Sequence, residues 1–446
     1  MDLTKGSIWK NILAFSIPML LSSLVQQLYN TVDLIFVGQM IGTSASAAVG
    51  ASTLLITCLV GFFSGMSVGS GVTIAKAFGA GNEHQLSKAI HCTVAFCIVG
   101  GIALMAAGYI ISPFALALMR TPDNLRAPAL GYMRIYFVSF PAILAYNLGS
   151  GVMRALGDSR SPLVAQFWGG LTNVAADYIL IRVMQNGVNG VALASLFSQT
   201  VASLIVFRKM TKLNSAYALR LKKVAFDMPL LKEMLRIGIP TGIQSMMVTL
   251  SNLIIQFNIN SLGEISIASF VSYFKAEMPI YLPQVAFGQA IMTYVGQNFG
   301  AGRIDRIKDG IRTTTILSVF ITIATCALLI VFGHGLFSIF SRDPRVISTG
   351  QRIIAVSFPF YFMYCFIEIY SGTLRGLGAA KTPALITLIC FCAMRPLLLC
   401  ILVPIWPNVQ CIAAVYPITW TASAVCLKIA LNRQFKLVET VMGKAS

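Results

Sequence analysis

A chain of 446 residues with 57% hydrophobic and only 11% charged side chains is not an ordinary soluble protein, in which about a quarter of residues are charged. The net charge of +18 could indicate nucleic-acid binding, but most of the 33 Lys and Arg residues border apolar stretches on the side of the N-terminus. This bias follows the positive-inside rule. We therefore expect membrane lipids rather than nucleic acid as partners, and both termini in the cytoplasm.

About twelve apolar stretches are each long enough to cross a bilayer core, which takes ~20 helical residues. In chain order they lie near residues 12–40, 48–76, 89–119, 129–153, 162–182, 188–207, 237–262, 267–298, 312–340, 346–374, 383–404 and 410–431. The sequence therefore predicts an all-α integral membrane protein with twelve transmembrane helices.

The second half of the chain repeats the first after 221 residues. Phe78-Gly79-Ala80-Gly81 returns as Phe299-Gly300-Ala301-Gly302, and Ser150-Gly151 returns as Ser371-Gly372. Secondary transporters use such repeats to build a midplane site that opens to either side. We predict an N-lobe over residues 1–207, a basic cytoplasmic linker over 208–236 and a C-lobe over 237–446, each lobe with six spans. Within the linker, Met228–Arg236 has the pattern of an amphipathic helix.

Glycines follow several of these stretches, as in Gly79–Asn82 and at Gly157 and Gly378. They are expected to end helices in the left-handed conformation. A phosphate-binding loop would require a Lys-Ser/Thr pair at a strand end, and the chain shows neither this motif nor a strand pattern. The sequence thus predicts transport without a cofactor, powered by an ion gradient.

Two aspartates lie deep in apolar stretches of the first copy. The residues 221 positions after Asp33 and Asp177 are Ile254 and Leu398, which are aliphatic. A charge at the centre of a membrane helix costs ~2.5–3.5 kcal/mol on insertion scales, so intramembrane acids are functional candidates. The difference between the copies places the expected chemistry in the first one.

Amides accompany both aspartates at helical spacing. Gln26, Asn30 and Asp33 share one helical face, and Asn173 lies one turn before Asp177. Two acids facing one lobe interior would repel each other unless a proton or a metal cation neutralises one of them. This pattern indicates an ion-coupling site; the alternative is a set of polar residues that only hold helices together.

The second copy carries two polar and aromatic stripes at helical spacing. Their members are Tyr361, Tyr364 and Glu368 in one span, and Glu277, Tyr281 and Gln284 in another. Carboxylates and aromatic rings attract organic cations, so these stripes are candidates for a substrate cleft. The alternative is an internal salt bridge, in which Lys275 or Arg395 meets Glu368.

The motifs together resemble the multidrug and toxic compound extrusion (MATE) transporters along essentially the whole chain. The motifs are Asn30-Thr31-Val32-Asp33, the paired Phe-Gly-Ala-Gly turns with Gln297-Asn298 before the second, Arg154-Ala155-Leu156-Gly157-Asp158 with its repeat at 375–378, and Asn173-x-x-x-Asp177. The chain is most similar to the bacterial DinF-like and MepA-like branch. The resemblance implies two six-helix lobes in a V-shaped fold. It also implies a multidrug efflux antiporter of the bacterial plasma (inner) membrane rather than an enzyme, exporting lipophilic cations and drugs such as antibiotics in exchange for protons or sodium ions.

The resemblance also assigns residues. The cation site of the family maps onto Asp33, Asn173 and Asp177, which would hold either a proton or a sodium ion, with Ser195 and Asn30 as further members. The residues expected to line the substrate cleft are Gln26, Gln256, Tyr281, Gln284, Tyr361, Tyr364 and Glu368. The chain departs from the other bacterial branch, because its seventh span has Asn252 and Gln256 in place of a glutamate.

Other functions fit the sequence less well. A flippase for lipid-linked precursors occurs on the related architecture, but the spans contain only Lys275 and Arg395 as cations for an anionic headgroup. An intramembrane enzyme would need a metal or nucleophile cluster, and a channel would need a filter-like repeat. We expect a monomeric cation-coupled antiporter, with the proton favoured over sodium. The sequence does not name the substrates or the roles of Glu277 and Arg395.

Overall fold

Helices make up nearly all of the computed structural model, which describes every residue except 37, 39–42, 119–120 and 444–446. In the first half they are α1 (Ile8–Phe36), α2 (Thr43–Gly79), α3 (Glu83–Leu118), α4 (Asp123–Ala155), α5 (Arg160–Asp177) and α6 (Gly187–Thr211). In the second half they are α7 (Met228–Asn260), α8 (Glu264–Ala276), α9 (Met278–Gly300), α10 (Ile304–Val331), α11 (Gly333–Phe340), α12 (Pro344–Ser357), α13 (Phe362–Gly376), α14 (Lys381–Thr387), α15 (Arg395–Ile405) and α16 (Val409–Gly443). The described residues contain no strand.

The helices follow the twelve predicted apolar stretches in order. By length and composition, eight described helices can cross a membrane, or nine if the α12 and α13 segments, which meet at 50°, form one span. The remaining predicted stretches correspond to α5, to α7 and to the pair α8–α9. Polar side chains lower the hydropathy of these segments, and the α8–α9 pair is interrupted at Glu277, just before Pro279. The all-α membrane architecture is confirmed.

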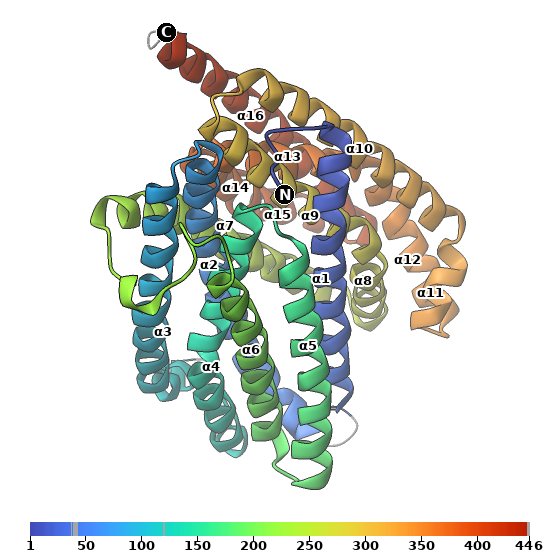
Figure 1. Cartoon of the computed structure of the whole chain (residues 1–446). Helices are drawn as coiled ribbons and strands as arrows, with labels where there is room; N and C mark the ends of the chain where they lie inside the picture. The colour runs from blue at the N-terminus through green and yellow to red at the C-terminus, as the bar shows by residue number, and fades with distance from the viewer. Residues whose placement is uncertain (37, 39–42, 119–120, 444–446) are drawn as a thin grey trace. The chain divides into compact units, whose positions relative to one another are not determined.

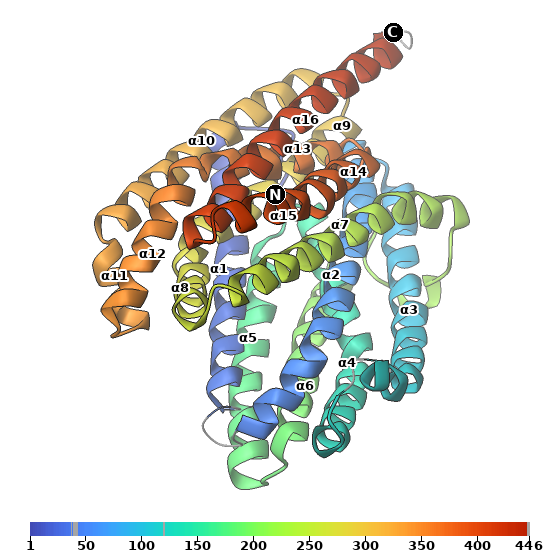
Figure 2. The same cartoon turned by 180° about the vertical axis from the view of Figure 1, so that it is seen from behind.

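The first packing unit comprises Met1–Asp2 and Ile17–Gly242. In this unit α4 packs against α2, α3 and α6, and α5 packs along α6, as both views show (Figures 1 and 2). Buried residues of α4 such as Met133, Phe140 and Leu144 form the core of this bundle.

The second packing unit comprises Leu3–Ser16 and Ile243–Ser446. Here α13 packs against α9, α10 and α16, while α12 packs against α8 and α16. A single large core of aliphatic and aromatic side chains fills this unit, with Tyr294, Ile353 and Leu374 fully buried. These packing units have other bounds than the predicted lobes, whose limits at 207 and 237 stay a prediction.

The segment Leu3–Ser16 is held in the second unit by the motif residues that precede the second Phe-Gly-Ala-Gly turn. The backbone N–H of Leu3 donates to Oε1 of Gln297 at 2.9 Å, and Nδ2 of Asn298 donates to the carbonyl of Leu3 at 3.3 Å. Nη1 of Arg303 donates to the carbonyl of Thr4 at 2.8 Å. Gln297 and Asn298 therefore have a structural role, which is to hydrogen-bond the backbone of Leu3 within the second unit.

The glycine turns show the internal repeat at atomic detail. Gly81 and Gly302 have φ values of 65° and 71°, and Gly157 and Gly378 have 79° and 92°. At each turn the residue after the glycine donates its N–H to a carbonyl five positions back, for example Asp158 to Met153 at 2.9 Å. This is the hydrogen bond of a helix end with a left-handed residue, and it confirms the predicted use of glycine.

The start of α7 packs on α2 through glycines spaced four residues apart on both helices. A Cβ atom added to Gly65 would lie 2.3 Å from the backbone N of Gly242, and one added to Gly69 would lie 2.1 Å from the carbonyl O of Met234. Small residues at this spacing let membrane helices approach backbone to backbone. The predicted amphipathic helix Met228–Arg236 is thus not a separate element: it forms the first turns of α7 and buries Met234.

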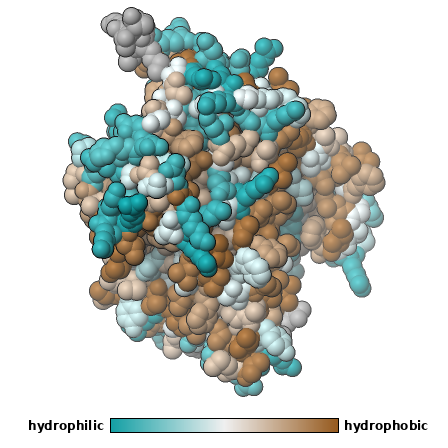
Figure 3. All heavy atoms as spheres, in the orientation of Figure 1, coloured by the Kyte–Doolittle hydropathy of each residue, from teal (hydrophilic) through white to brown (hydrophobic). Residues whose placement is uncertain are grey.

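The surface matches a protein surrounded by lipid. On the face shown in Figure 3, hydrophobic side chains cover much of the helices, and hydrophilic ones gather near the segment that joins α6 to α7. Large apolar side chains such as Leu28, Phe257 and Phe320 are mostly exposed. In water such a surface would drive aggregation, whereas in a bilayer it is the expected exterior.

Candidate functional site

Three polar side chains meet where α1 and α5 approach each other in the first unit. Asn173 and Asp177 lie one turn apart on α5, and both are 0% exposed. Asp33 of α1 is half-buried and interacts electrostatically with both of them. A π-helical turn, Tyr178–Val183, begins directly after Asp177. Such turns are frequent at functional sites because they change the direction of side chains along a helix.

Most polar side-chain atoms of this cluster are buried and have no hydrogen-bond partner in the described part of the chain. Oδ1 of Asp33, both amide atoms of Asn173 and both carboxylate oxygens of Asp177 are buried and make no hydrogen bond with the described residues. A buried polar atom without a partner costs about 1–3 kcal/mol, and more when it is charged. A proton shared between the carboxylates, or a cation held by their oxygens, would remove this cost. The side chains of Asp33, Asn173 and Asp177 therefore fit either ion: a proton needs one carboxylate oxygen, and sodium prefers several oxygen ligands.

The approach of α1 to α5 depends on Gly170. A Cβ atom added there would lie 3.1 Å from the ring of Tyr29, closer than an ordinary van der Waals contact, so the ring would have to shift by a few tenths of an ångström. The hydroxyl of Tyr29 accepts a hydrogen bond from Nε2 of Gln166 at 3.1 Å, which fixes the position of α1 one turn before Asp33. These two contacts hold α1 against α5 one turn away from the acid cluster.

Sequence reasoning missed the tyrosines around the cluster. Tyr29 and Tyr136 interact electrostatically with Asp33, and Tyr132 interacts with both Asp33 and Asp177. Tyr132 and Tyr136 are one turn apart on α4, with ring centroids 5.9 Å apart. In the sequence, the signal that could have drawn attention to them is their spacing of four residues, which places both on one face of α4. Phenolic hydroxyls can donate to a carboxylate or accept from a protonated one, so these neighbours are compatible with either protonation state of the acids.

Some predicted members do not join the cluster. Gln26 and Asn30 are exposed, and Nδ2 of Asn30 makes its described contact with Gln27 at 3.5 Å. Ser195 is half-buried on α6 and makes no described hydrogen bond to Asp33, Asn173 or Asp177. The structure thus brings together Asp33, Asn173 and Asp177.

The second unit contains a separate aromatic and acidic network on α9, α13 and α16. The hydroxyl of Tyr361 donates to Oε2 of Glu277 at 3.4 Å, and that of Tyr364 donates to Oε1 of Glu368 at 3.0 Å. The ring of Trp420 lies 4.8 Å from Tyr361 and 5.7 Å from Tyr364. The predicted stripe on α13 is therefore one cluster in which each acid has a tyrosine partner.

The other predicted cleft residues lie in different surroundings. The rings of Tyr281 and Tyr364 are 5.9 Å apart, so Tyr281 belongs to the aromatic network. Gln284 is buried and donates to Oγ1 of Thr322 at 3.1 Å. Gln256 on α7 donates to Asn260 at 2.8 Å. Their assignment to a substrate cleft stays a prediction.

The expected salt bridge to Glu368 is not formed by Lys275 or Arg395. Lys275 is exposed, with Nζ 5.7 Å from the centre of the Phe340 ring. The cation that interacts electrostatically with Glu368 is Arg375, whose Nη2 donates to Gln244 at 3.0 Å. Arg375 lies two helical turns after Glu368 on the same face of α13, a spacing that sequence analysis could have noticed, whereas the position of Gln244 on α7 depends on tertiary packing.

Arg395 is instead the centre of its own buried network. It is 2% exposed, and its Nη1 and Nη2 donate to Ser251 at 3.0 Å and Thr419 at 3.2 Å. Its guanidinium lies 4.3 Å from the Phe391 ring and 5.0 Å from the Tyr416 ring. Hydroxyl acceptors and two ring faces stabilise a cation without a carboxylate partner.

These features define an α-helical membrane protein with several spans, built from two copies of one helical unit. The chain belongs to the MatE family, whose profile matches residues 18–179 and again residues 240–400, once in each half. This family consists of transporters, so the assignment supports the prediction that the chain is not an enzyme. It also confirms the resemblance found in the motifs.

Curated relatives carry drug-resistance names. The chain is 28% identical over 394 residues to "Probable multidrug resistance protein YoeA" of Bacillus subtilis, covering 86% of this chain and 85% of that protein. It is 25% identical to the probable multidrug resistance protein NorM of Thermotoga maritima, covering 85% and 82%. It is 23% identical to the multidrug export protein MepA of Staphylococcus saprophyticus, covering 84% and 83%.

Solved structures share the fold. An outward-facing multidrug resistance MATE transporter of the MOP superfamily superposes with a TM-score of 0.91 at 21% identity, covering 98% of both chains. A MOP superfamily transporter from Pyrococcus furiosus, described as having a binding pocket of reverse polarity, gives 0.88 at 21% identity, again over 98% of both chains. At this identity the likeness establishes the all-α MATE fold.

Proposed function

We propose that this protein exports lipophilic organic cations across the bacterial plasma membrane in exchange for protons. The observation that carries the proposal is the cluster of Asp33, Asn173 and Asp177, in which five buried polar atoms lack a hydrogen-bond partner. The family assignment and the drug-resistance names of the relatives support a drug-like substrate. The basic residues support cytoplasmic termini.

The coupling step in this proposal is the protonation of the carboxylate pair. Two adjacent carboxylates in a low-dielectric site repel each other, so one of them is readily neutralised by a proton. The proton binds when the site is open to the outside and leaves when it is open to the cytoplasm, and the organic cation moves the other way. One proton exchanged for one monovalent cation is electroneutral. A second proton would let the transporter use the membrane potential, worth roughly 2.3 kcal/mol per charge per 100 mV.

Sodium is the alternative coupling ion at the same residues. The oxygens of Asp33, Asn173 and Asp177 would be its ligands, as sodium prefers several oxygen ligands at once. The proton is favoured because it needs only one carboxylate, and Ser195, the expected fourth oxygen, is not joined to the cluster.

The test is uptake of a fluorescent organic cation, such as an ethidium-like dye, into everted vesicles, with proton and sodium gradients imposed separately. We expect a proton gradient to drive uptake in sodium-free buffer, a protonophore to stop it, and Asp33→Asn to abolish it at equal expression. Uptake that survives the protonophore and follows the sodium gradient would assign sodium to the site instead.

Flipping of an anionic lipid-linked precursor is the second candidate. The buried Arg395 and the half-buried Arg375 of the second unit favour it, because a flippase needs positive groups for the headgroup. Both guanidiniums already have partners within their unit, which supports a structural role. Transport of an anionic polyprenyl-linked sugar by reconstituted protein, without any cation efflux, would reverse the ranking.

A further inference from the structure

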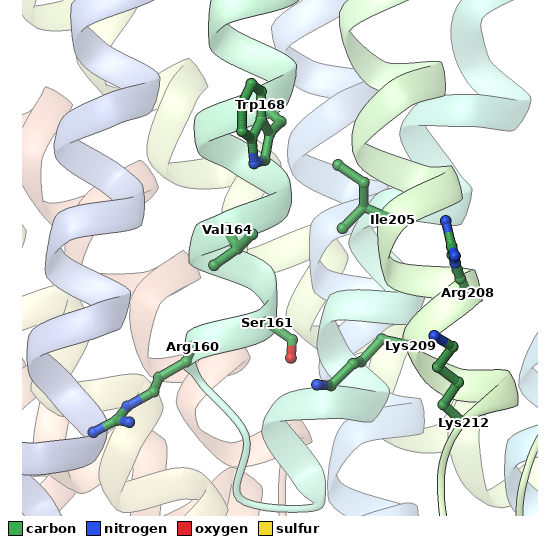
Figure 4. Close-up of a pocket in the computed structure, with 8 residues that line it drawn as sticks. All are labelled: Arg160, Ser161, Val164, Trp168, Ile205, Arg208, Lys209 and Lys212. Atoms are coloured by element: carbon green, nitrogen blue, oxygen red, sulfur yellow. The ribbon is translucent and has the colours of Figure 1, made fainter.

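A basic hollow lies on the surface of the first unit, between α5 and α6, away from the acid cluster. Its volume is about 480 Å³, within the range of small-ligand sites. Four cations line it: Arg160 at the start of α5, and Arg208, Lys209 and Lys212 at the end of α6. In the close-up, Lys209 extends from α6 toward Ser161 of α5, and the amine of Lys212 also points into this space, whereas Arg160 turns aside (Figure 4).

The deeper wall of the hollow is apolar. It is formed by Val164 and Trp168 of α5 and Ile205 of α6 (Figure 4). Val164 is 48% exposed and Trp168 is 50% exposed. Both lie nine residues before a member of the acid cluster, Asn173 and Asp177 respectively. Nine steps of 100° make two and a half turns, which leaves the two positions on opposite sides of the helix, so the hollow occupies the face of α5 opposite to the cluster.

The four cations are not neutralised within the protein. None has an acidic partner within salt-bridge distance among the described residues. The acid nearest in sequence is Asp158, but its carboxylate accepts the backbone N–H groups of Arg160 at 3.0 Å and Ser161 at 2.9 Å, and the hydroxyl of Ser161 at 2.5 Å. Asp158 is therefore engaged as a cap of α5, and the side-chain cations are available to an anion.

A second hollow shows a basic surface that is partly neutralised by residues of its own unit. It lies between α10 and α16 in the second unit and has a volume of about 700 Å³. There Nζ of Lys308 pairs with Glu439 at 2.6 Å, and Nζ of Lys428 lies 5.4 Å from the ring centre of Tyr370. Among the described residues, none of the four cations between α5 and α6 has such a partner, so that hollow keeps more unneutralised positive charge and is the better anion site.

The dimensions suit a phospholipid rather than a small free anion. Eight residues separate Arg160 from Trp168, which is about 12 Å along a helix. The polar layer on each side of a bilayer is about 5–8 Å thick, so cations level with the headgroups would place Trp168 near the top of the hydrocarbon core. Tryptophan is enriched at this depth, and anionic lipids are attracted to basic surfaces of the cytoplasmic leaflet.

We propose that this hollow binds an anionic phospholipid, with its phosphate at Lys209 and Lys212 and an acyl chain along Val164 and Trp168. The lipid would hold the end of α6 to the start of α5. Both the cations and the apolar wall are needed: cations alone would bind any phosphate, and an apolar wall alone would bind any lipid.

The test compares lipids of one chain length by native mass spectrometry of the delipidated full chain in detergent. We expect phosphatidylglycerol to bind more tightly than phosphatidylcholine. The double variant Lys209→Gln, Lys212→Gln should lose about 25-fold in phosphatidylglycerol affinity, at about fivefold for each basic side chain removed. The matched control Lys222→Gln, Lys223→Gln removes the same charge from exposed residues outside the hollow and should keep the affinity.

Two further variants separate charge from shape. Lys209→Arg, Lys212→Arg keeps both charges and should restore binding. Val164→Trp fills the apolar wall without changing charge and should weaken phosphatidylglycerol binding while the protein keeps its thermal unfolding temperature without added lipid.

Three results would overturn the proposal. Equal losses in the Lys209/Lys212 and Lys222/Lys223 variants would mean general attraction to a basic surface. Equal affinity for both lipids would remove the role of the headgroup. If inorganic phosphate or glycerol phosphate raised the unfolding temperature as much as phosphatidylglycerol does, the ligand would be a free phosphate and not a lipid.

Discussion

In the first unit, Asp33, Asn173 and Asp177 leave five buried polar atoms without a partner, whereas in the second unit Glu277 and Glu368 each accept a hydrogen bond from a tyrosine. Unpartnered atoms occur in the second unit too, such as the hydroxyls of Tyr273 and Tyr416 and Nε of Arg395, but none of those among the described residues belongs to an acid. The two copies share a fold and differ in which polar groups they satisfy. A concentrated, unsatisfied cluster indicates a site for an exchangeable ion, and a satisfied one indicates a framework or a binding wall.

The largest expected effect is the loss of driven transport in Asp177→Asn. The asparagine keeps the size of the side chain but cannot take up and release a proton, so dye uptake should fall to the level of vesicles without the protein. The matched control is Glu277→Gln, which removes one intramembrane acid from the other unit and should leave proton-driven uptake in place. If both variants lost dye uptake to a similar extent at equal expression, the assignment of coupling to the first unit alone would be wrong.

Arg395→Ala should lower the stability of the second unit without changing the coupling. Truncation removes the two hydroxyl contacts and both ring contacts of the guanidinium and leaves a cavity, at a cost of about 3 kcal/mol. Thermal unfolding in detergent measures this loss, and transport per folded molecule should stay near the wild-type value. Arg395→Met, which keeps most of the volume, should recover most of the stability. If both variants instead unfold like the wild type but stop transport, Arg395 acts on the substrate.

Glu368→Gln should change substrate preference more than coupling. Glutamine can still accept the hydrogen bond from Tyr364, so the aromatic network should persist without its negative charge. We expect a roughly tenfold shift in relative transport between cationic and zwitterionic dyes, equivalent to about 1.4 kcal/mol. Complete loss of transport of every dye would show that the second unit holds an essential charge.

Ser195→Ala should have the smallest effect, a change of no more than about twofold in transport under either gradient, because its hydroxyl does not contact the cluster. The measurement is initial uptake with sodium and proton gradients applied in turn. A selective loss of sodium-driven uptake would place the Ser195 oxygen among the ligands of a sodium ion.

The features that sequence alone predicted well are local or repeated. The glycine turns depend on one backbone conformation, and Asn173 and Asp177 lie one turn apart on the same helix, so their proximity follows from spacing. Acids in apolar stretches are rare enough to be noticed, which is why Asp33 was found.

The features that sequence missed depend on contacts between distant segments. Tyr132 and Tyr136 interact electrostatically with the cluster from α4; their spacing of four residues shows that they share a face of that helix but not which helices that face meets. Asn30 lies three residues before Asp33 but is exposed, whereas Tyr29 is the α1 residue that packs near Gly170. The partners of Arg395 are Ser251 and Thr419, which are 144 and 24 residues away in the chain. No periodicity encodes such pairs.

The hydrogen bonds between Leu3 and the pair Gln297-Asn298 have a consequence for biosynthesis. A ribosome adds about 5–20 residues per second, so the partners of Leu3 are synthesised roughly 15–60 s after it. During that time the segment Leu3–Ser16 has no binding site, because its unit consists of later residues. The beginning of α1 therefore stays undocked while the first unit assembles. It can pack in its final position only after the second unit has folded. A substitution at Gln297 would then act as a late assembly defect, leaving the first unit intact.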